Sequence, residues 1–130
     1  MFSIRQFKKN QPMIIKIKNL RLKTILGIYE WEENVDREII INAKIHTNFD
    51  RALTSNEISD AIDYDDIVTK IKNLIANKRF KLVEKMAQDI MNEIMQDSRI
   101  SKCKLEIDKV GAVESLESFS ITIEQENKNG

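Results

Sequence analysis

Residues 37–49 read REIIINAKIHTNF, and this stretch decides the fold. One set of alternate positions carries Ile39, Ile41, Ala43, Ile45 and, beyond Thr47, Phe49. Successive side chains of a β-strand point to opposite faces of a sheet, so this period of two predicts a long strand. One face of that strand is apolar enough to be buried, and the other carries polar groups suited to solvent.

Three other stretches show the same alternation. Residues 13–25 form the first predicted strand, with a bulge or bend near Asn19 where the alternation is interrupted. Gly27 ends this strand, and the polar segment 29–36 forms a loop that makes the first two strands antiparallel if it is a hairpin. Residues 102–108 and 118–124 alternate as the third and fourth strands.

Two stretches have helical spacing instead. Asp63 is a good N-cap, and apolar residues follow it at intervals of three and four to about Asn77. A second apolar stripe predicts a helix from about Lys81 to Gln96. The segment 50–63 is polar and irregular, with apolar residues near its end that can support a short helical turn. Its length favours a functional loop.

The order β-β-α-α-β-β predicts an α+β domain with a four-stranded, mainly antiparallel sheet and two helices on one face. A chain of 130 residues suits one such domain, which we expect over residues 13–126. We expect residues 1–12 to be a flexible extension and residues 127–130 a frayed tail. An open sheet leaves two edges with unpaired backbone groups, which predicts oligomerisation through those edges.

The composition argues against several classes of protein. The 21 Lys and Arg residues balance 21 Asp and Glu residues, which disfavours a sequence-independent nucleic-acid binder. A single Cys, Cys103, and a single His, His46, cannot form a disulfide or a Cys/His zinc site within the chain. No segment approaches the roughly 18 apolar residues of a membrane span, and no cleavable leader is visible. We therefore expect a cytoplasmic protein with no nucleic-acid partner, no membrane contact and no metal.

Four features stand apart from the periodic core. They are the acidic cluster Glu30, Glu32 and Glu33 in the first loop, Tyr64 at the start of the first helix, Glu84 near the start of the second, and Lys109 at the end of the third strand. Each has an ordinary structural explanation by itself. Acidic loop residues are commonly only solvated, and a carboxylate in a first helical turn is favoured by the helix dipole.

Four motifs give these residues a context. They are GIYEWE at 27–32, IDYDDI at 62–67, RFKLVEKMAQDI at 79–90 and EIDKVGAV at 106–113. In this order and approximate spacing the chain resembles the bacterial dihydroneopterin aldolase family, which includes the closely similar dihydroneopterin triphosphate epimerase. Each motif is weak alone, but four in register over about residues 13–126, with the predicted order of strands and helices, make the resemblance specific.

The resemblance implies a reaction that needs no metal, Schiff base or other cofactor. Members of this family split 7,8-dihydroneopterin into 6-hydroxymethyl-7,8-dihydropterin and glycolaldehyde in tetrahydrofolate biosynthesis. The pterin is the electron sink, because the electrons of the broken C1′–C2′ bond flow into its C6–N5 imine. The protein must fix the pterin, remove a proton from the side-chain hydroxyl and protonate the enamine-like intermediate. Re-addition to the other face of the aldehyde would also give C2′ epimerase activity.

The resemblance also assigns binding residues. Glu84 is the pterin anchor, because two carboxylate oxygens can accept from the ring N–H and the exocyclic amine. The backbone of Val83 contacts the ring. Glu32 is the carboxylate near the dihydroxypropyl side chain, with a catalytic as well as a binding part, and Glu30 or Glu33 takes its place if the register differs by a residue or two.

Two further residues carry the proton chemistry in the resemblance. Lys109 corresponds to the lysine that the family uses as general acid and base. Tyr64 corresponds to a tyrosine that lies near the substrate, takes part in proton transfer and usually comes from the adjacent subunit. The family assembly is the tunnelling fold, in which four subunits join their sheets into a barrel with helices outside and two rings stack into an octamer.

The sequence departs from the aldolase pattern at two places. Val110 follows Lys109 where many aldolases have Pro, and residues 55–57 read SNE where many have Thr-Asp-Asn. Two alternatives to an aldolase therefore stay open. One is the 2′-epimerase of dihydroneopterin triphosphate, for which the candidate phosphate contacts are Lys16, Lys18, Lys78 and Arg79. The other is a catalytically silent, pterin-binding oligomer.

Overall fold

The computed structural model describes residues 13–27, 36–47, 52–111 and 113–127. In chain order its elements are β1 (Met13–Ile25), β2 (Asp36–Thr47), α1 (Ala52–Ser55), the 3-10 helix η3 (Ile58–Asp60), α2 (Tyr64–Asn77), α3 (Val83–Ile94), β3 (Ile100–Val110) and β4 (Ser118–Glu126). The predicted α+β order of strands and main helices is confirmed. The predicted extension 1–12, most of the predicted tail, Phe49 and the acidic cluster lie outside the described residues.

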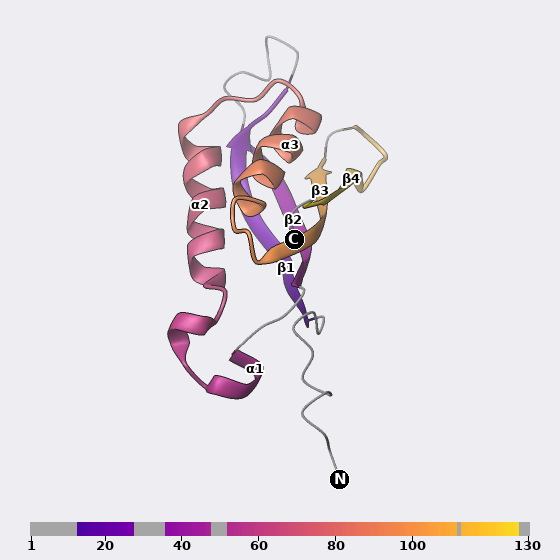
Figure 1. Ribbon diagram of the computed structural model, residues 1–130. Coiled ribbons are helices and arrows are strands. Elements are labelled where there is room, and N and C mark those ends of the chain that lie inside the picture. Colours follow the sequence, from indigo (N-terminus) through magenta and orange to yellow (C-terminus); the bar gives the residue numbers. More distant parts are fainter. Residues whose placement is uncertain (1–12, 28–35, 48–51, 112, 128–130) are drawn as a thin grey trace.

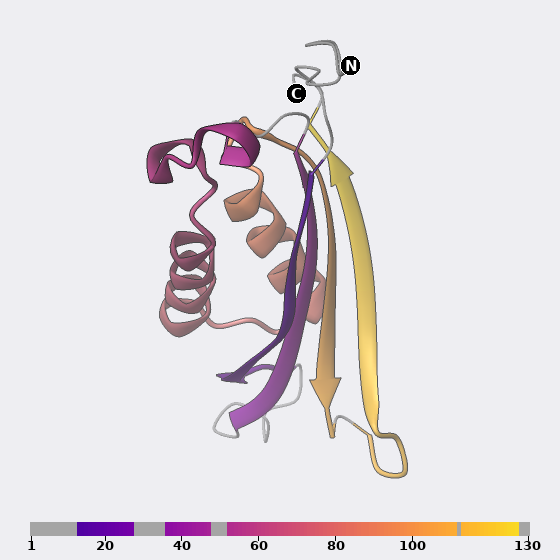
Figure 2. The same ribbon diagram turned by 90° about the horizontal axis from the view of Figure 1, so that it is seen from below.

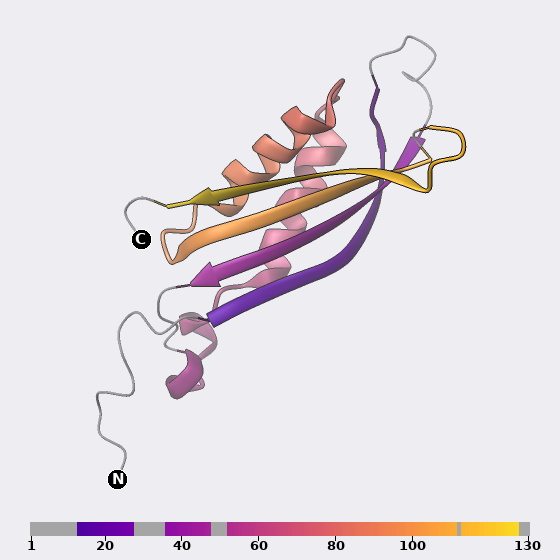
Figure 3. The ribbon, with the colours of Figure 1, turned by 90° about the vertical axis from the view of Figure 1, so that its right-hand side faces the viewer.

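The four strands form one antiparallel sheet in the order β1-β2-β3-β4 (Figure 3). The predicted irregularity in β1 is confirmed, since the β1–β2 register shifts between Ile17 and Leu20. Asn19 lies at this shift with φ 55°, a left-handed conformation that Asn tolerates better than most residues. Its backbone N–H donates to Oδ1 of Asn42 at 2.9 Å, which gives the displaced group a partner.

Two boundaries of the predicted helices differ from the structure. The helix predicted from about Lys81 to Gln96 begins at Val83 and ends at Ile94. Leu82 before it has extended backbone angles, and Met95 after it has left helical geometry with ψ 0°. The short helical turn predicted near the end of segment 50–63 is confirmed as η3, and the short helix α1 before it was not predicted. Asp63 is confirmed as the N-cap of α2, because its carboxylate accepts from the backbone N–H of Asp66 at 3.2 Å.

Both long helices cover the same face of the sheet, and the described elements leave the opposite face open (Figure 2). The core between them contains fully buried residues of β2, β3, α2 and α3: Ile39, Ile41, Ile45, Leu105, Ile107, Ile71, Met86, Ile90 and Met91. Burying such a side chain is worth about 1.5–3 kcal/mol. No helix in the described ranges has both the length and the apolar composition needed to cross a membrane.

Cys103 belongs to this core. It alternates with Leu105 and Ile107 on the helix-covered face of β3 and is fully buried. Burial raises the pKa of its thiol to about 12, because the charged thiolate would lose its solvation. The Cys103 thiol is thus a packing group rather than a nucleophile at neutral pH.

The start of α3 lies toward the end of the sheet at which β3 finishes. The chain runs along α2, returns through α3 and enters β3 after a short turn, so α3 and β3 are antiparallel (Figure 1). The segment before α3 is tied to the end of β1 by a parallel bridge between Leu26 and Phe80. The N–H of Gly27 also donates to the carbonyl of Phe80 at 3.4 Å. These contacts bring Val83 and Glu84 toward the end of the sheet that carries Lys109.

Candidate active site

Lys109 lies on the helix-covered face of the sheet. It continues the alternation of Cys103, Leu105 and Ile107 and is paired with the fully buried Ile39 on β2. Unlike those three apolar residues it is only partly buried, because it lies near the end of β3. The strand pairing therefore holds an amine beside the apolar core without enclosing it.

Glu84 and Val83 form the start of α3. Val83 is buried, whereas Glu84 is exposed in the first turn. Leu82 precedes them as the N-cap and makes no side-chain capping bond. The first amide groups of a helix have no partners within the helix, so this start can donate to an acceptor on a ligand while Glu84 accepts from a donor.

Phe119 is a candidate that sequence reasoning missed. It pairs with Lys109 across the β3–β4 ladder and so shares the helix-covered face with it. The residue is 44% exposed, although the apolar residues farther along β4 on that face are partly buried. An exposed aromatic ring beside an amine can stack against a flat heterocycle. In the sequence Phe119 reads only as the first apolar residue of a strand, which gave no signal of a binding role.

Tyr64 lies toward the opposite end of the molecule. It opens α2 and is 67% exposed. Arg99, which precedes β3, donates from Nη1 to the carbonyl of Ala61 at 3.3 Å, so the segment before α2 is next to the start of β3. From Ile100 to Lys109 a strand spans about 30 Å. One chain therefore brings Lys109, Glu84 and Val83 toward one end and separates Tyr64 from them.

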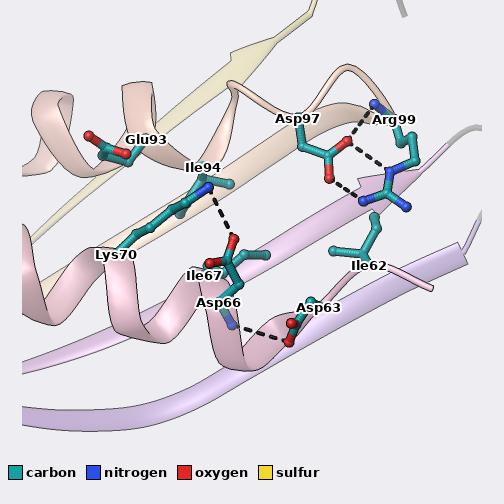
Figure 4. A pocket seen from close by; sticks show the side chains of 9 residues that line it. All are labelled: Ile62, Asp63, Asp66, Ile67, Lys70, Glu93, Ile94, Asp97 and Arg99. Carbon is teal, nitrogen blue, oxygen red and sulfur yellow. Dashed lines mark hydrogen bonds and ion pairs between the residues drawn. The ribbon is translucent and has the colours of Figure 1, made fainter. Parts of the chain in front are cut away.

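A polar network surrounds the start of α2 (Figure 4). Asp63 caps the helix, and Lys70 pairs with Asp66 at 3.0 Å. Hydrogen bonds from Arg99 hold the pKa of Asp97 below its ordinary value, against the opposing effect of burial. The hollow between these side chains has a volume of about 70 Å³, too small for a bicyclic ligand. We interpret the network as support for the start of α2.

Lys78 and Arg79, two of the predicted phosphate contacts, lie in the connection between α2 and α3. They line a hollow of about 570 Å³ together with Lys23, Thr24, Ile25, Asp36, Ile75, Ala76 and Asn77. Lys78 pairs with Asp89, which also pairs with Lys85 at 2.9 Å. Hydrogen bonds from these two lysines lower the pKa of the Asp89 carboxyl. This cationic corner lies at the same end of the sheet as Lys109.

The predicted loop carboxylate, Glu32, and its neighbours Glu30 and Glu33 lie outside the described residues. The strand residues on either side of that loop are described, and Ile25 pairs with Asp36 in the β1–β2 ladder. This pair lies beyond the Leu22–Ile39 pair, whose Ile39 faces Lys109. Both flanking residues are therefore at the end of the sheet that carries Lys109.

Comparison with protein families decides where the chain belongs. A model of the dihydroneopterin aldolase family matches residues 15–124, which include both long helices and nearly all of the sheet. The chain belongs to the dihydroneopterin aldolase family. The resemblance seen in the four sequence motifs is confirmed.

Curated relatives of the family carry two names. The chain is 40% identical over 110 residues to the dihydroneopterin triphosphate 2'-epimerase of Escherichia coli strain K12, an alignment covering 85% of this chain and 92% of the relative. It is 24% identical over 114 residues to the dihydroneopterin aldolase of the same strain, covering 88% of this chain and 93% of the relative. Both alignments span nearly the whole family domain.

The fold of the family is also confirmed by structure. The crystal structure of Escherichia coli dihydroneopterin aldolase in complex with neopterin superposes with a TM-score of 0.81 at 23% identity. The superposition covers 87% of this chain and 98% of that one. The four-stranded sheet with two helices on one face is thus the tunnelling fold of this family.

Proposed function

We propose that this family member acts on a dihydroneopterin by breaking the C1′–C2′ bond, and that epimerisation of dihydroneopterin triphosphate at C2′ is its main activity. The observation that carries the choice is the identity of 40% to a relative named as the epimerase, against 24% to one named as the aldolase. The sequence motifs alone favoured the aldolase. The difference in identity over nearly equal lengths reverses that order, and cleavage of 7,8-dihydroneopterin becomes the second candidate activity.

Glu84 and Val83 are the proposed pterin contacts. The carboxylate of Glu84 would accept two hydrogen bonds from the ring N–H and the exocyclic amine, while the backbone of Val83 would contact a ring acceptor. The exposure of Glu84 and the uncapped start of α3 support these parts. The ring of Phe119 would provide an apolar surface for the pterin from the side of β4.

Lys109 is the proposed general acid and base. As the C1′–C2′ bond breaks, the C2′ hydroxyl loses its proton and becomes the carbonyl of the leaving aldehyde. The electron pair moves into the C6–N5 imine and gives an enamine. For epimerisation the aldehyde turns and the enamine carbon attacks its other face, so the same atoms are rejoined with C2′ inverted. An amine beside an apolar row can carry the proton in both directions.

Tyr64 is proposed to act in a site made by two chains. The separation of Tyr64 from Lys109 within one chain supports this, since the two can meet only if a second copy provides one of them. Glu32 remains the proposed carboxylate near the substrate side chain. A site shared in this way is incomplete without the oligomer.

The edge strands have complementary charges that suit a ring of copies. On the face away from the helices, β1 carries Lys16, Lys18, Arg21 and Lys23, whereas β4 carries Glu124 and Glu126 and no basic residue. Opposite charges on two edges favour pairing of β1 of one copy with β4 of the next. Such a head-to-tail contact closes into a ring when its rotation permits, which agrees with the barrel implied by the family.

The triphosphate would meet the cationic corner. Arg79 is exposed, and the ammonium of Lys78 already lies beside Asp89 and 5.4 Å from the centre of the Phe80 ring. Guanidinium groups bind phosphate oxygens in pairs, so Arg79 is the first expected contact. By the alternation of β1, Lys16 and Lys18 lie on the opposite face of the sheet, so they are not proposed as contacts of the triphosphate in the catalytic site.

The test is turnover of both substrates with identification of the products. We expect inversion at C2′ of dihydroneopterin triphosphate at a higher kcat/KM than release of glycolaldehyde from 7,8-dihydroneopterin. The Arg79→Gln variant should lose the preference for the triphosphate and keep its rate on the unphosphorylated substrate. Faster cleavage than epimerisation would assign the chain as an aldolase. Tight binding of neopterin with no turnover of either substrate would indicate that the protein is a catalytically silent, pterin-binding oligomer.

A further inference from the structure

Three lysines lie side by side on the face of the sheet away from the helices. Lys44 on β2 pairs with Lys16 on β1 and with Lys104 on β3, and all three are on the same face. Directly opposed residues in an antiparallel sheet have Cβ atoms about 4.5–5.5 Å apart, and like charges at that distance are destabilising. The row therefore costs the fold free energy unless an anion lies against it.

Within the described part of the chain the charges of this row are only partly balanced, because Glu124 on β4 lies opposite Lys104. No ion pair there includes Lys16, Lys44, Lys104 or their neighbour Lys18. The carboxylate of Glu124 already pairs with Lys102 at 2.6 Å, so one acidic group serves two lysines. The row is thus a local excess of positive charge on a chain whose formal net charge is zero.

Protection of a sheet edge does not explain the row. Lysines on an edge strand can favour pairing with an acidic edge over unspecific aggregation, and that purpose can account for Lys16 and Lys18 on β1. Lys44 and Lys104 lie on β2 and β3, which are paired on both sides. A central strand presents no open edge, so edge protection does not explain these two lysines. Lys104 has Glu124 opposite it on β4, whereas both cross-strand neighbours of Lys44 are lysines.

The row lines a shallow groove. Its volume is about 180 Å³, and its walls are Lys16, Ile17, Lys18, Asn42, Ala43, Lys44, Lys104 and Glu106. The carboxylate of Glu106 is the one acidic group among these lining residues, against four ammonium groups. The field of the lysines is also felt by His46, whose pKa is lowered by burial first and then by the charges of Lys102 and Lys44.

We propose that this groove binds a linear triphosphate group. The two outer lysines of the row, Lys16 and Lys104, are two strand spacings apart, so their Cα atoms are separated by about 10 Å. This length suits a chain of phosphates better than a single phosphate. Several ammonium donors around such a chain form charge-assisted hydrogen bonds and offset the repulsion between the lysines. The groove is on the opposite face from Lys78 and Arg79, so it is separate from the proposed catalytic end.

The proposal is tested by isothermal titration calorimetry of the full-length chain with inorganic tripolyphosphate. The double variant Lys44→Ala/Lys104→Ala should weaken binding by about tenfold or more, because two charge-assisted contacts are lost. The matched control Lys72→Ala/Lys81→Ala removes the same charge from exposed positions and should leave binding within about twofold. Because Arg79 is itself a proposed phosphate contact, the Tm comparison is made in chains that also carry Arg79→Gln. There tripolyphosphate should raise the Tm of the chain with the intact groove and of the control, but not that of the groove variant.

Several outcomes would overturn the proposal. The first is that tripolyphosphate does not bind at low salt. The second is that the control variant loses as much tripolyphosphate binding as the groove variant. The third is that Arg79→Gln loses this binding while the groove variant keeps it. A nucleoside triphosphate that binds like tripolyphosphate supports recognition of the phosphate chain itself, whichever molecule carries it. Tighter binding of a single-stranded oligonucleotide than of tripolyphosphate would instead assign the face to nucleic acid. If the groove variant without ligand had a lower Tm than the parent chain without ligand, the premise that the lysines destabilise the fold by mutual repulsion would be contradicted.

Discussion

The guanidinium of Arg99 binds the carboxylate of Asp97 through two hydrogen bonds, from Nε to Oδ1 at 2.9 Å and from Nη2 to Oδ2 at 2.6 Å. A further nitrogen of Arg99, Nη1, reaches the carbonyl of Ala61 at 3.3 Å. One planar side chain thus joins the turn before β3 to the segment before α2. The relationship helps to set where α2 begins, and with it the position of Tyr64.

This pair predicts a stability that depends on pH. Arg99 lowers the pKa of Asp97 in the folded chain, so the stabilisation is present above the unfolded pKa of about 3.9 and is lost as the pH falls through the lowered value. Arg99→Gln should lower the free energy of unfolding at pH 7 by about 1 kcal/mol, a small figure because the pair is partly solvated. Urea denaturation should show that the difference in free energy of unfolding between the parent chain and Arg99→Gln is smaller at about pH 2 to 3 than at pH 7.

The exposed substitution Lys72→Gln serves as the control for this experiment and should change stability little at either pH. An equal loss of stability from Arg99→Gln at both pH values would contradict the role of the Asp97 carboxylate. The contact with Ala61 or the packing of the arginine stem would then carry the effect.

Lys109→Met should abolish proton transfer while preserving the length and apolar stem of the side chain. We expect kcat to fall by about 10²–10⁴ with neopterin affinity nearly unchanged. Rapid-quench turnover and calorimetric neopterin binding measure the two quantities, with Lys72→Met as the matched exposed lysine. Full activity of Lys109→Met would remove Lys109 from the chemistry.

Glu84→Gln tests the pterin anchor, because an amide of the same shape replaces one acceptor with a donor. Loss of charge-assisted hydrogen bonds should weaken neopterin binding by about 10- to 100-fold. Glu114→Gln, at an exposed position in the turn before β4, is the matched control and should bind normally. If Glu84→Gln lowered kcat and left binding intact, Glu84 would have a part in the reaction rather than in holding the ring.

Mixing two impaired variants tests the shared site. Tyr64→Phe and Lys109→Met should each lose activity, but co-refolding them in equal amounts should restore about a quarter of the parent activity. The fraction follows because a site made by two random copies carries both native residues in one arrangement out of four. Activity no higher than the sum of the separately refolded variants would indicate a site within one chain.

Local features of the fold could be predicted from the sequence. Alternation in residues 37–49 and 102–108 indicates strands because side-chain direction in a strand depends only on position along it. The N-cap at Asp63 and the bend near Asn19 were readable for the same reason, since each depends on a few neighbouring residues. The short helical turn predicted from Ile58 onward is present as η3, whereas α1 was not predicted, because its four residues hold too little periodicity.

The sequence by itself determined the β-β-α-α-β-β order, the apolar faces and the family, because periodicity and motif spacing are properties of the chain in one dimension. Only the tertiary structure decided which residues meet. Strand pairing put Lys109 opposite Ile39 and Phe119, and aligned Lys16, Lys44 and Lys104 in a row. Antiparallel packing of α2, α3 and β3 separated Tyr64 from Lys109. Such relationships depend on register between distant segments, which no local pattern encodes.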